Sequence, residues 1–247
     1  MNIITTRGVV IKTQDYKEND KLVWLFTEKL GKISLIAKGA RKNKSKLMSI
    51  TLPFCYGEFT LYKGKSMYIL NEGKIIESFQ QFLDDFDYLI YGTYFNELID
   101  IVSEDEEKQF ELFKEFITCF YLMKSKVVDL ELLSRAFELK VLKYTGYELN
   151  LNYCSMCNEK MKNSNYISFQ YLGAICDECE KSYGTKITNM AYNILKFLNN
   201  STLDKVSRVK VNEVARKEIY KILAQIISTN YQRRPKSLDM LKEFFEK

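Results

Sequence analysis

Lys32-Ile-Ser-Leu-Ile-Ala-Lys38 is the stretch that most clearly indicates the fold of the N-terminal region. Ile33, Leu35 and Ala37 alternate along it with polar side chains. Because successive side chains of a strand point to opposite faces, this alternation predicts a strand with one buried and one solvated face.

Glycines divide the first 80 residues into further segments of this kind, rich in β-branched and aromatic side chains. The predicted strands are residues 8–13, 21–27, 32–38, 58–62 and 67–71. Five short strands suit a small closed barrel, because closure removes the exposed edges of a sheet. We therefore predict an OB-like barrel over residues 1–80, with an SH3-like barrel as the structural alternative.

Residues 81–150 have a different pattern, with apolar side chains at helical spacing and no proline. Ser103 and Glu106 have the spacing of a capping box and predict the start of the second of three helices. The apolar stripes expected to be buried are Phe86, Ile90, Tyr94, Leu98 and Ile101; Phe110, Phe113, Ile117 and Phe120; and Leu133, Phe137 and Val141. This region is the predicted central helical domain.

Four of the six cysteines form two pairs, Cys154-Ser-Met-Cys157 and Cys176-Asp-Glu-Cys179, separated by eighteen residues. This is the spacing of a four-thiolate zinc site, with the intervening residues expected to form a short hairpin. Disulfides would give the same even count, but the absence of a signal peptide favours a reducing compartment and hence a metal. Four protein ligands leave no position for water, so the zinc predicted in residues 151–185 is structural. Cys55 and Cys119 are predicted to be small buried residues.

Helical spacing resumes beyond Thr188 and predicts that residues 186–247 pack with the central helical domain. The apolar positions of these helices are Ile194, Leu195 and Leu198; Val214, Ile219, Leu223 and Ile226; and Leu238, Leu241 and Phe245. The predicted fold class is therefore α+β. A five-stranded OB-like β-barrel is followed by an α-helical domain with an embedded four-cysteine zinc-binding segment.

The composition excludes most enzyme classes. The chain has no histidine, which is the usual general base near neutral pH and the partner of most serine and cysteine nucleophiles. Gly64-Lys65-Ser66 resembles the end of a phosphate-binding loop, but Phe59 stands where that motif needs glycine. No apolar run approaches the roughly 18 residues that cross a bilayer. We expect a cytoplasmic protein with no catalytic residues, no membrane contact and no small-molecule substrate.

Positive charge is concentrated in residues 1–80 and 152–247, which flank an acidic middle region. The densest cluster is residues 38–46, here called the basic loop, whose cations are Lys38, Arg41, Lys42, Lys44 and Lys46. Such a loop on a barrel rim can neutralise nucleic-acid phosphates without recognising sequence. A second cluster, Arg233 and Arg234, precedes the last predicted helix. An ordinary solvated surface is the alternative interpretation of both clusters.

Aromatic side chains are interleaved with these N-terminal cations, as single-strand-binding barrels require. The candidates for stacking on bases are Trp24, Tyr62 and Tyr68. Packing within the barrel is the alternative role for each of them.

Taken in order, these motifs resemble the bacterial recombination mediator family RecO, whose members act in DNA repair. The resemblance covers nearly the whole chain. It depends on Arg7-Gly-Val-Val-Ile11, Tyr16-Lys-Glu-Asn-Asp20, Phe26-Thr27, Leu30-Gly-Lys-Ile33, Ala37-Lys-Gly-Ala-Arg-Lys42, Ser45-Lys46, Phe95-Asn-Glu-Leu98, Phe137-Glu-Leu139, Gly146-Tyr147 and the two cysteine pairs.

The resemblance implies a protein that binds single- and double-stranded DNA, anneals complementary strands and is not an enzyme. It also implies two protein partners, the acidic tail of single-strand DNA-binding protein and RecR, and a role in helping to load RecA onto single strands covered by single-strand DNA-binding protein. Arg135 occupies the position where a matching arginine would bind the acidic tail. A nucleoid-associated location follows from the DNA partner.

Two other classes of function fit parts of the sequence. A zinc-ribbon nucleic-acid-binding module in transcription or RNA metabolism would account for the cysteines and the basic loop. A metal-dependent nuclease would need carboxylates near the basic surface, whereas most acids lie in residues 81–151. Preference for DNA over RNA, and strand annealing without nucleotide or divalent metal, would separate the three classes.

Overall fold

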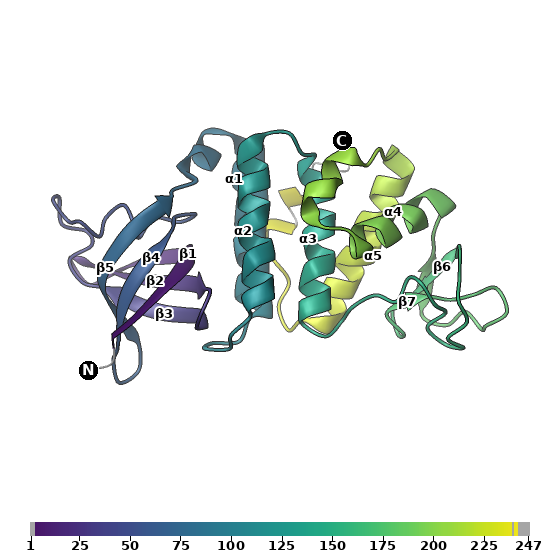
Figure 1. Cartoon of the computed structure of the whole chain (residues 1–247), viewed down its shortest axis with the longest axis horizontal. Helices are drawn as coiled ribbons and strands as arrows, with labels where there is room; N and C mark the ends of the chain where they lie inside the picture. The colour runs from purple at the N-terminus through teal and green to yellow at the C-terminus, as the bar shows by residue number, and fades with distance from the viewer. Residues whose placement is uncertain (1–2, 239, 242–247) are drawn as a thin grey trace. The chain divides into compact units, whose positions relative to one another are not determined.

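A computed structural model describes residues 3–238, 240 and 241 of the chain. Its N-terminal part is a closed barrel in the order β1-β2-β3-β5-β4, in which only the β3–β5 pair is parallel (Figure 1). The strands are β1 (Ile3–Tyr16), β2 (Asp20–Thr27), β3 (Gly31–Ala37), β4 (Tyr56–Lys63) and β5 (Tyr68–Glu77). The OB-like prediction is confirmed.

The barrel interior is filled partly by a residue that no predicted strand contains. Ile50, from the connection between β3 and β4, is buried inside the barrel. A Cβ atom on Gly57 or Gly73 would lie only 2.5 and 2.8 Å from Ile50 side-chain carbons. Glycine at these two strand positions therefore leaves the space that Ile50 occupies.

Helices and short strands follow the barrel. They are η1 (Gln80–Asp84), α1 (Phe86–Val102), α2 (Phe110–Ser125), α3 (Leu130–Tyr144), β6 (Tyr166–Ser168), β7 (Gly173–Ala174), β8 (Gly184–Lys186), α4 (Asn189–Asn200), η2 (Leu203–Arg208) and α5 (Glu213–Asn230). None of the described helices has the length and apolarity needed to span a membrane. Phe245, expected on the last helix, lies outside the described residues.

The capping box predicted at Ser103 is wrong, because α2 begins at Phe110. Ser103 instead ends α1, where its backbone N–H donates to the carbonyl of Ile99. Glu106 has a left-handed backbone conformation, with φ of 62°, and its N–H donates to the carbonyl of Lys32 in β3. Pairing with the barrel therefore takes the chain out of a helical path at this point.

Three of the predicted apolar positions are also exposed. Phe86, Phe110 and Val214 are 61%, 39% and 58% exposed. Each lies in the first turn of its helix. A helical side chain leans back over the turn before its own residue, and these three residues have no such helical turn before them. The buried face of α2 instead contains Leu112, Phe113, Phe116, Cys119, Phe120 and Met123.

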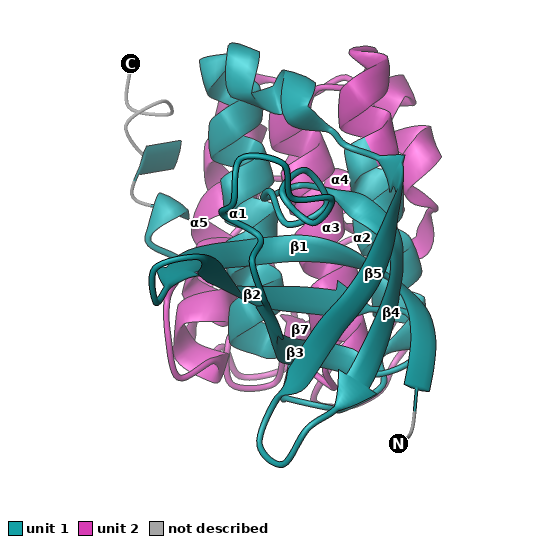
Figure 2. Ribbon diagram, turned by 90° about the vertical axis from the view of Figure 1, so that its left-hand side faces the viewer, with its two compact units in different colours: residues 1–120, 235–241 teal, residues 121–234, 242–247 magenta. Residues whose placement is uncertain are grey.

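The chain divides into two compact units (Figure 2). Unit 1 contains residues 1–120 and 235–241, and unit 2 contains residues 121–234 and 242–247. In unit 1, Phe113 and Phe116 of α2 pack against Phe26 of β2 at ring distances of 5.7 and 5.8 Å. The predicted domain boundaries near residues 80, 150 and 185 fall inside these units and stay predictions.

Candidate nucleic-acid interface and metal site

The basic loop is held in place by the turn between β1 and β2. The backbone N–H of Gly39 donates to the Asp20 carboxylate at 2.8 Å, and the N–H of Arg41 donates to the carbonyl of Asn19 at 3.0 Å. Gly39 has a φ of 66°, which costs glycine nothing. The loop therefore starts from a fixed position on the barrel.

Arg41 differs in role from the lysines of the basic loop. Its guanidinium pairs with Asp15 at 3.1 Å and donates to the carbonyls of Lys17 and Glu18 at 3.2 and 3.1 Å. These contacts join the loop to the β1–β2 turn and use much of the donor capacity of the side chain. Sequence reasoning missed this role, because nothing local to Arg41 identifies Asp15 as its partner.

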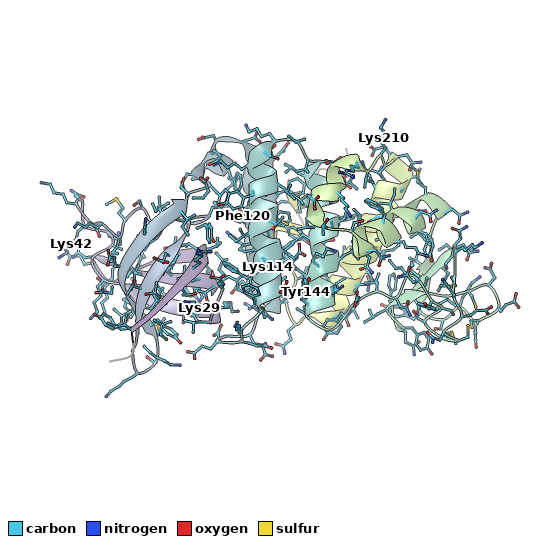
Figure 3. The ribbon with its side chains drawn as sticks, viewed as in Figure 1. Lys29, Lys42, Lys114, Phe120, Tyr144 and Lys210 are labelled. Carbon is cyan, nitrogen blue, oxygen red and sulfur yellow. The ribbon has the colours of Figure 1, made fainter. Side chains whose placement is uncertain are left out.

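The four lysines of the basic loop, Lys38, Lys42, Lys44 and Lys46, are exposed. Figure 3 shows Lys42 directed away from the strands. Within the described part of the chain, none of these lysines forms an ion pair. Four solvated ammonium groups on a fixed loop can approach an anionic backbone without first breaking a protein contact.

The aromatic candidates separate by burial. Tyr68 is only 4% exposed and belongs to the barrel core, so its ring presents no face to a ligand. Trp24 and Tyr62 are half-buried. Of the three aromatic residues, Tyr68 therefore packs in the barrel core and is not available to stack on a base.

Arg233 and Arg234 are exposed at the end of unit 2, between α5 and Pro235. The basic loop belongs to unit 1. The two clusters are therefore features of separate units, and a role of the arginines in DNA binding stays a prediction.

The two cysteine pairs come together as their spacing predicts. All four Sγ atoms lie within 4.8 Å of one another, and those of Cys157 and Cys176 are 3.8 Å apart. A tetrahedral ion with metal–sulfur bonds of about 2.3 Å has sulfur–sulfur edges of about 3.8 Å. The cluster thus has the size and the donor set of a four-thiolate metal site.

Local backbone geometry supports this cluster. The N–H of Asn158 donates to the carbonyl of Cys154 at 2.9 Å, which closes a tight turn, and the N–H of Cys176 donates to the Cys154 sulfur at 3.4 Å. Burial opposes ionisation of Cys154, but backbone N–H groups of Cys157 and Cys176 outweigh it and lower the pKa of the Cys154 thiol to about 6. At least one ligand is therefore prepared as a thiolate.

A small hairpin connects the two pairs, as predicted. β6 and β7 are antiparallel, with Ile167 opposite Ala174, and β8 adds a third strand. Gly173 lies so close to the chain before Cys154 that a Cβ atom there would meet the Asn150 carbonyl. This close approach joins the hairpin to the first cysteine turn.

The remaining cysteines are buried, as expected. Cys55 and Cys119 have no exposed surface. Burial raises the pKa of Cys55 to about 12 and that of Cys119 well above its usual value. Both thiols stay protonated and serve as small packing groups.

Arg135 lies inside unit 2. Its side chain is 1% exposed and pairs with the carboxylate of Glu138, which is fully buried, at 2.6 Å. The ring of Tyr220 lies over the guanidinium at 5.0 Å. A tail carboxylate would have to displace Glu138 or the ring to reach Arg135, and the predicted role of this residue stays untested.

A second arginine of unit 2 was missed by the sequence reasoning. Arg216 of α5 pairs with Asp129 and Glu131 at the start of α3, at 2.5 and 2.7 Å. The only local signal is that Asp129 precedes a helix, which indicates a cap but not a distant partner.

Comparison with known proteins covers both parts of the chain. Residues 1–79 match the family model described as "Recombination protein O N terminal", and residues 83–239 match "Recombination protein O C terminal". A protein named DNA repair protein RecO from Clostridium perfringens (strain 13) is 55% identical over 242 residues, 98% of each chain. Its namesake from Clostridium acetobutylicum is 54% identical over 241 residues, again 98% of each. That of Caldicellulosiruptor saccharolyticus is 28% identical over 98% of this chain and 99% of its own.

Proposed function

Because the chain belongs to the RecO family of DNA repair proteins, we propose that it is a non-enzymatic, DNA-binding recombination mediator. The observation that carries this proposal is the basic loop, which the β1–β2 turn holds on the barrel while four lysines remain exposed. Exposed ammonium groups on such a loop bind phosphates, release counterions and do not discriminate bases.

The same loop supports a role in strand annealing and in recombination. Two complementary strands repel each other through their phosphates, and a cationic surface that neutralises part of this charge favours their encounter. Three more specific parts of the proposal are based on the family resemblance. They are binding of single- and double-stranded DNA, contact with RecR, and help in loading RecA onto strands covered by single-strand DNA-binding protein. DNA as a partner would place the protein with the nucleoid in the cytoplasm.

For the cysteine cluster we propose a structural zinc ion held by Cys154, Cys157, Cys176 and Cys179. The thiolate donor set, the tetrahedral edge length and the turn N–H groups support this choice. The ion would neutralise the clustered thiolates and connect the two turns. With four sulfur ligands it would leave no open coordination position for catalysis.

A salt titration of oligonucleotide binding tests the role of the basic loop. Replacement of Lys42, Lys44 and Lys46 by glutamine removes three exposed cations and leaves the Arg41 contacts intact. Affinity for single strands should fall, and the slope of log affinity against log salt should shrink by roughly 0.7 for each lost phosphate contact. Annealing of complementary oligonucleotides, without nucleotide or divalent metal, should weaken in parallel.

The matched control replaces three exposed lysines of unit 2 by glutamine: Lys160, Lys162 and Lys210. It changes the net charge by the same amount. If both triple variants lose DNA affinity equally, the basic loop contributes only through the overall charge of the protein and is not a specific binding site. Glutamate in place of Lys38, Arg41 and Lys42 also removes the Arg41 contacts. It should therefore weaken binding and disturb the β1–β2 turn together. Tighter binding to RNA than to DNA would favour the RNA-binding class of function instead.

Docking of the acidic tail at Arg135 needs a variant that does not leave a charge buried. Arg135→Gln combined with Glu138→Gln removes both charges and keeps hydrogen-bonding groups in place. If Arg135 binds a tail carboxylate, this double variant should bind a tail peptide more weakly while its affinity for bare DNA is unchanged. Equal peptide affinity would leave Arg135 with a purely structural role.

A further inference from the structure

The outer surface of the barrel presents the only tryptophan of the chain, Trp24. Its neighbours in β2, Val23 and Leu25, point into the core and are fully buried. Phe26 faces outward like Trp24 but is buried beneath Phe113 and Phe116 of α2. Trp24 keeps part of its surface exposed, so the indole belongs to a part of the sheet that α2 does not fully cover.

The strand register places a cation directly beside this ring. Lys12 of β1 is the cross-strand partner of Trp24, and its ammonium group lies 4.8 Å from the ring centroid. A β-bulge between Val10 and Lys12 inserts Ile11 and sets the outward direction of Lys12. The ring therefore carries an exposed positive charge at its face, and a base that stacks there displaces this lysine, whose ammonium group can then pair with a phosphate of the strand.

Apolar side chains extend the same surface across the sheet. Leu22, two residues before Trp24, is paired with Ile36 of β3, which is paired in turn with Ile69 of β5. All three are half-buried. We call Lys12, Leu22, Trp24 and Ile36 the Trp24 surface.

The charges around this surface suit an anionic strand. The cross-strand partners of Trp24 are Lys12 and Ser34. β3 leads directly from Ile36 into Lys38 of the basic loop. Two acids of the neighbouring β1–β2 turn, Asp15 and Asp20, are engaged with Arg41 and with the N–H of Gly39.

We infer that the Trp24 surface is a base-stacking site for single-stranded DNA, with the strand continuing from Trp24 toward the basic loop. The inference rests on the proposed DNA-binding function and adds a preference for unpaired strands. Every base has a flat π face that can stack on an indole, so such a site accepts any sequence. In a duplex those faces are already stacked on each other, whereas the phosphates contacted by the basic loop are equally available.

Because Trp24 is the sole tryptophan, its fluorescence reports on this site alone. The experiment is a titration of the full-length protein with an oligothymidylate, and separately with a DNA duplex. Tryptophan emission and the anisotropy of a labelled oligonucleotide are both recorded. We expect saturable quenching by the single strand, at the concentrations where anisotropy shows binding. The duplex should give an anisotropy signal with little quenching.

Three variants separate stacking from packing. Trp24→Leu keeps apolar bulk and should lower single-strand affinity by roughly 5- to 150-fold, the range for one lost base stack, with duplex affinity nearly unchanged. Trp24→Phe keeps an aromatic face and should retain most of the affinity. Phe110→Leu is the matched control, because Phe110 is an exposed ring of unit 1 that also has a lysine, Lys114, over it at 5.3 Å.

The outcomes distinguish this inference from the proposed function. DNA binding by anisotropy with unchanged emission, together with full affinity in Trp24→Leu, would overturn the stacking site and leave the proposed function standing. An equal loss of single-strand and duplex affinity in Trp24→Leu would also overturn it, since the substitution would then act through the shape of the barrel. Absence of any DNA binding by the wild-type protein would overturn the proposed function and the inference together.

Discussion

The barrel and unit 2 bury different kinds of side chain. The cluster that fills the barrel is apolar and consists of Val10, Val23, Leu25, Ile33, Leu35, Ala37, Ala40, Ile50, Cys55, Phe59, Leu61, Tyr68 and Leu70, and the polar side chains that the barrel strands bury, Thr6, Thr27 and Lys32, lie outside it. Unit 2 also has apolar residues inside, but among them it buries Arg135, Glu138, Lys140 and Asn199. It contains the cluster of four thiols as well.

This difference determines how each region can be disrupted. Apolar packing is non-directional, so truncation of one side chain costs its own transfer free energy and a cavity. A buried charge or polar group depends on a specific partner, and loss of that partner leaves the full cost of desolvation. Unit 2 should therefore lose much stability when one partner of a buried polar contact or one metal ligand is removed. The barrel should lose stability mainly when buried volume is removed.

The largest effect is expected from removal of the metal site. Structural zinc contributes about 10–16 kcal/mol in small zinc-finger peptides, which is as large as the whole 5–15 kcal/mol that stabilise most proteins. Cys157→Ser, or a strong chelator, should abolish metal binding and unfold the cysteine segment, residues 151–185, while the barrel stays protected. Metal analysis and hydrogen exchange of the two regions measure this.

Cys55→Ser is the control for the metal prediction, because it removes a thiol from the barrel core. It should reduce the stability of the barrel and leave the metal content unchanged. If the reduced protein contains no metal and hydrogen exchange in residues 151–185 is unchanged, unit 2 folds without a metal ion and the prediction is wrong.

The next largest effect concerns the buried charge pair. Arg135→Met leaves the carboxylate of Glu138 without this cation and should cost about 3–5 kcal/mol. Addition of Glu138→Leu should restore most of that stability, because the second charge no longer has to be buried. Denaturant unfolding of the two variants tests the prediction. A double variant as unstable as the single one would mean that shape, and not charge, holds Arg135 in place.

In the barrel, Leu61→Ala should cost about 2–5 kcal/mol through a cavity in the core. The metal content of the protein should not change, since the affected residues are in the other unit. Ile75→Ala is the matched control: Ile75 is on the neighbouring strand β5 but is 39% exposed, and its loss should cost less than about 0.5 kcal/mol. Loss of metal in Leu61→Ala would contradict the separation of the two regions.

The same contrast explains what the sequence could predict. Apolar alternation in residues 32–38 and the spacing of the cysteine pairs depend on near neighbours, and both predictions are confirmed. β1 and β5 extend well beyond the predicted segments, because their outer parts pair with a neighbouring strand without a regular apolar face. The spacing of apolar residues along the chain indicates which residues are buried, but it does not indicate which strands pair.

The errors and omissions involve partners far apart in the chain. Arg41 meets Asp15 across the β1–β2 turn, and Glu106 meets Lys32 through the backbone, so neither contact leaves a local pattern. Arg135 lies two residues before Phe137, and the family resemblance alone singles it out from sequence, because its burial beneath Tyr220 depends on α5, some 80 residues later. A charged residue in a helix therefore indicates a surface or a buried pair equally well from sequence alone.

The smallest effect is a dependence on pH at the start of α3. Burial acts to raise the pKa of Asp129, but hydrogen bonds from Arg216 and from the N–H of Leu132 outweigh it and hold that pKa below its ordinary 3.8. Glu131 shifts the other way, because burial raises its pKa more than Arg216 lowers it. The two carboxylates therefore oppose each other in the same pH range, and Glu131→Gln isolates Asp129.

A folded-state pKa below the unfolded value means that Asp129 stabilises the protein above pH 3.8, and that this stability is lost as pH falls through the folded pKa. At neutral pH, Glu131→Gln should exceed the double variant Glu131→Gln/Asp129→Asn in stability by about 0.3–2 kcal/mol, because asparagine keeps the N-cap acceptor but loses the negative charge at the helix start and beside Arg216. The difference should shrink as pH falls below that value, in unfolding experiments on both variants at matched ionic strength. If the stability difference between the two variants does not change over this pH range, the charge of Asp129 contributes nothing and the residue acts only by shape. The ion pair between Asp129 and Arg216 would then not be one of the polar contacts that stabilise unit 2.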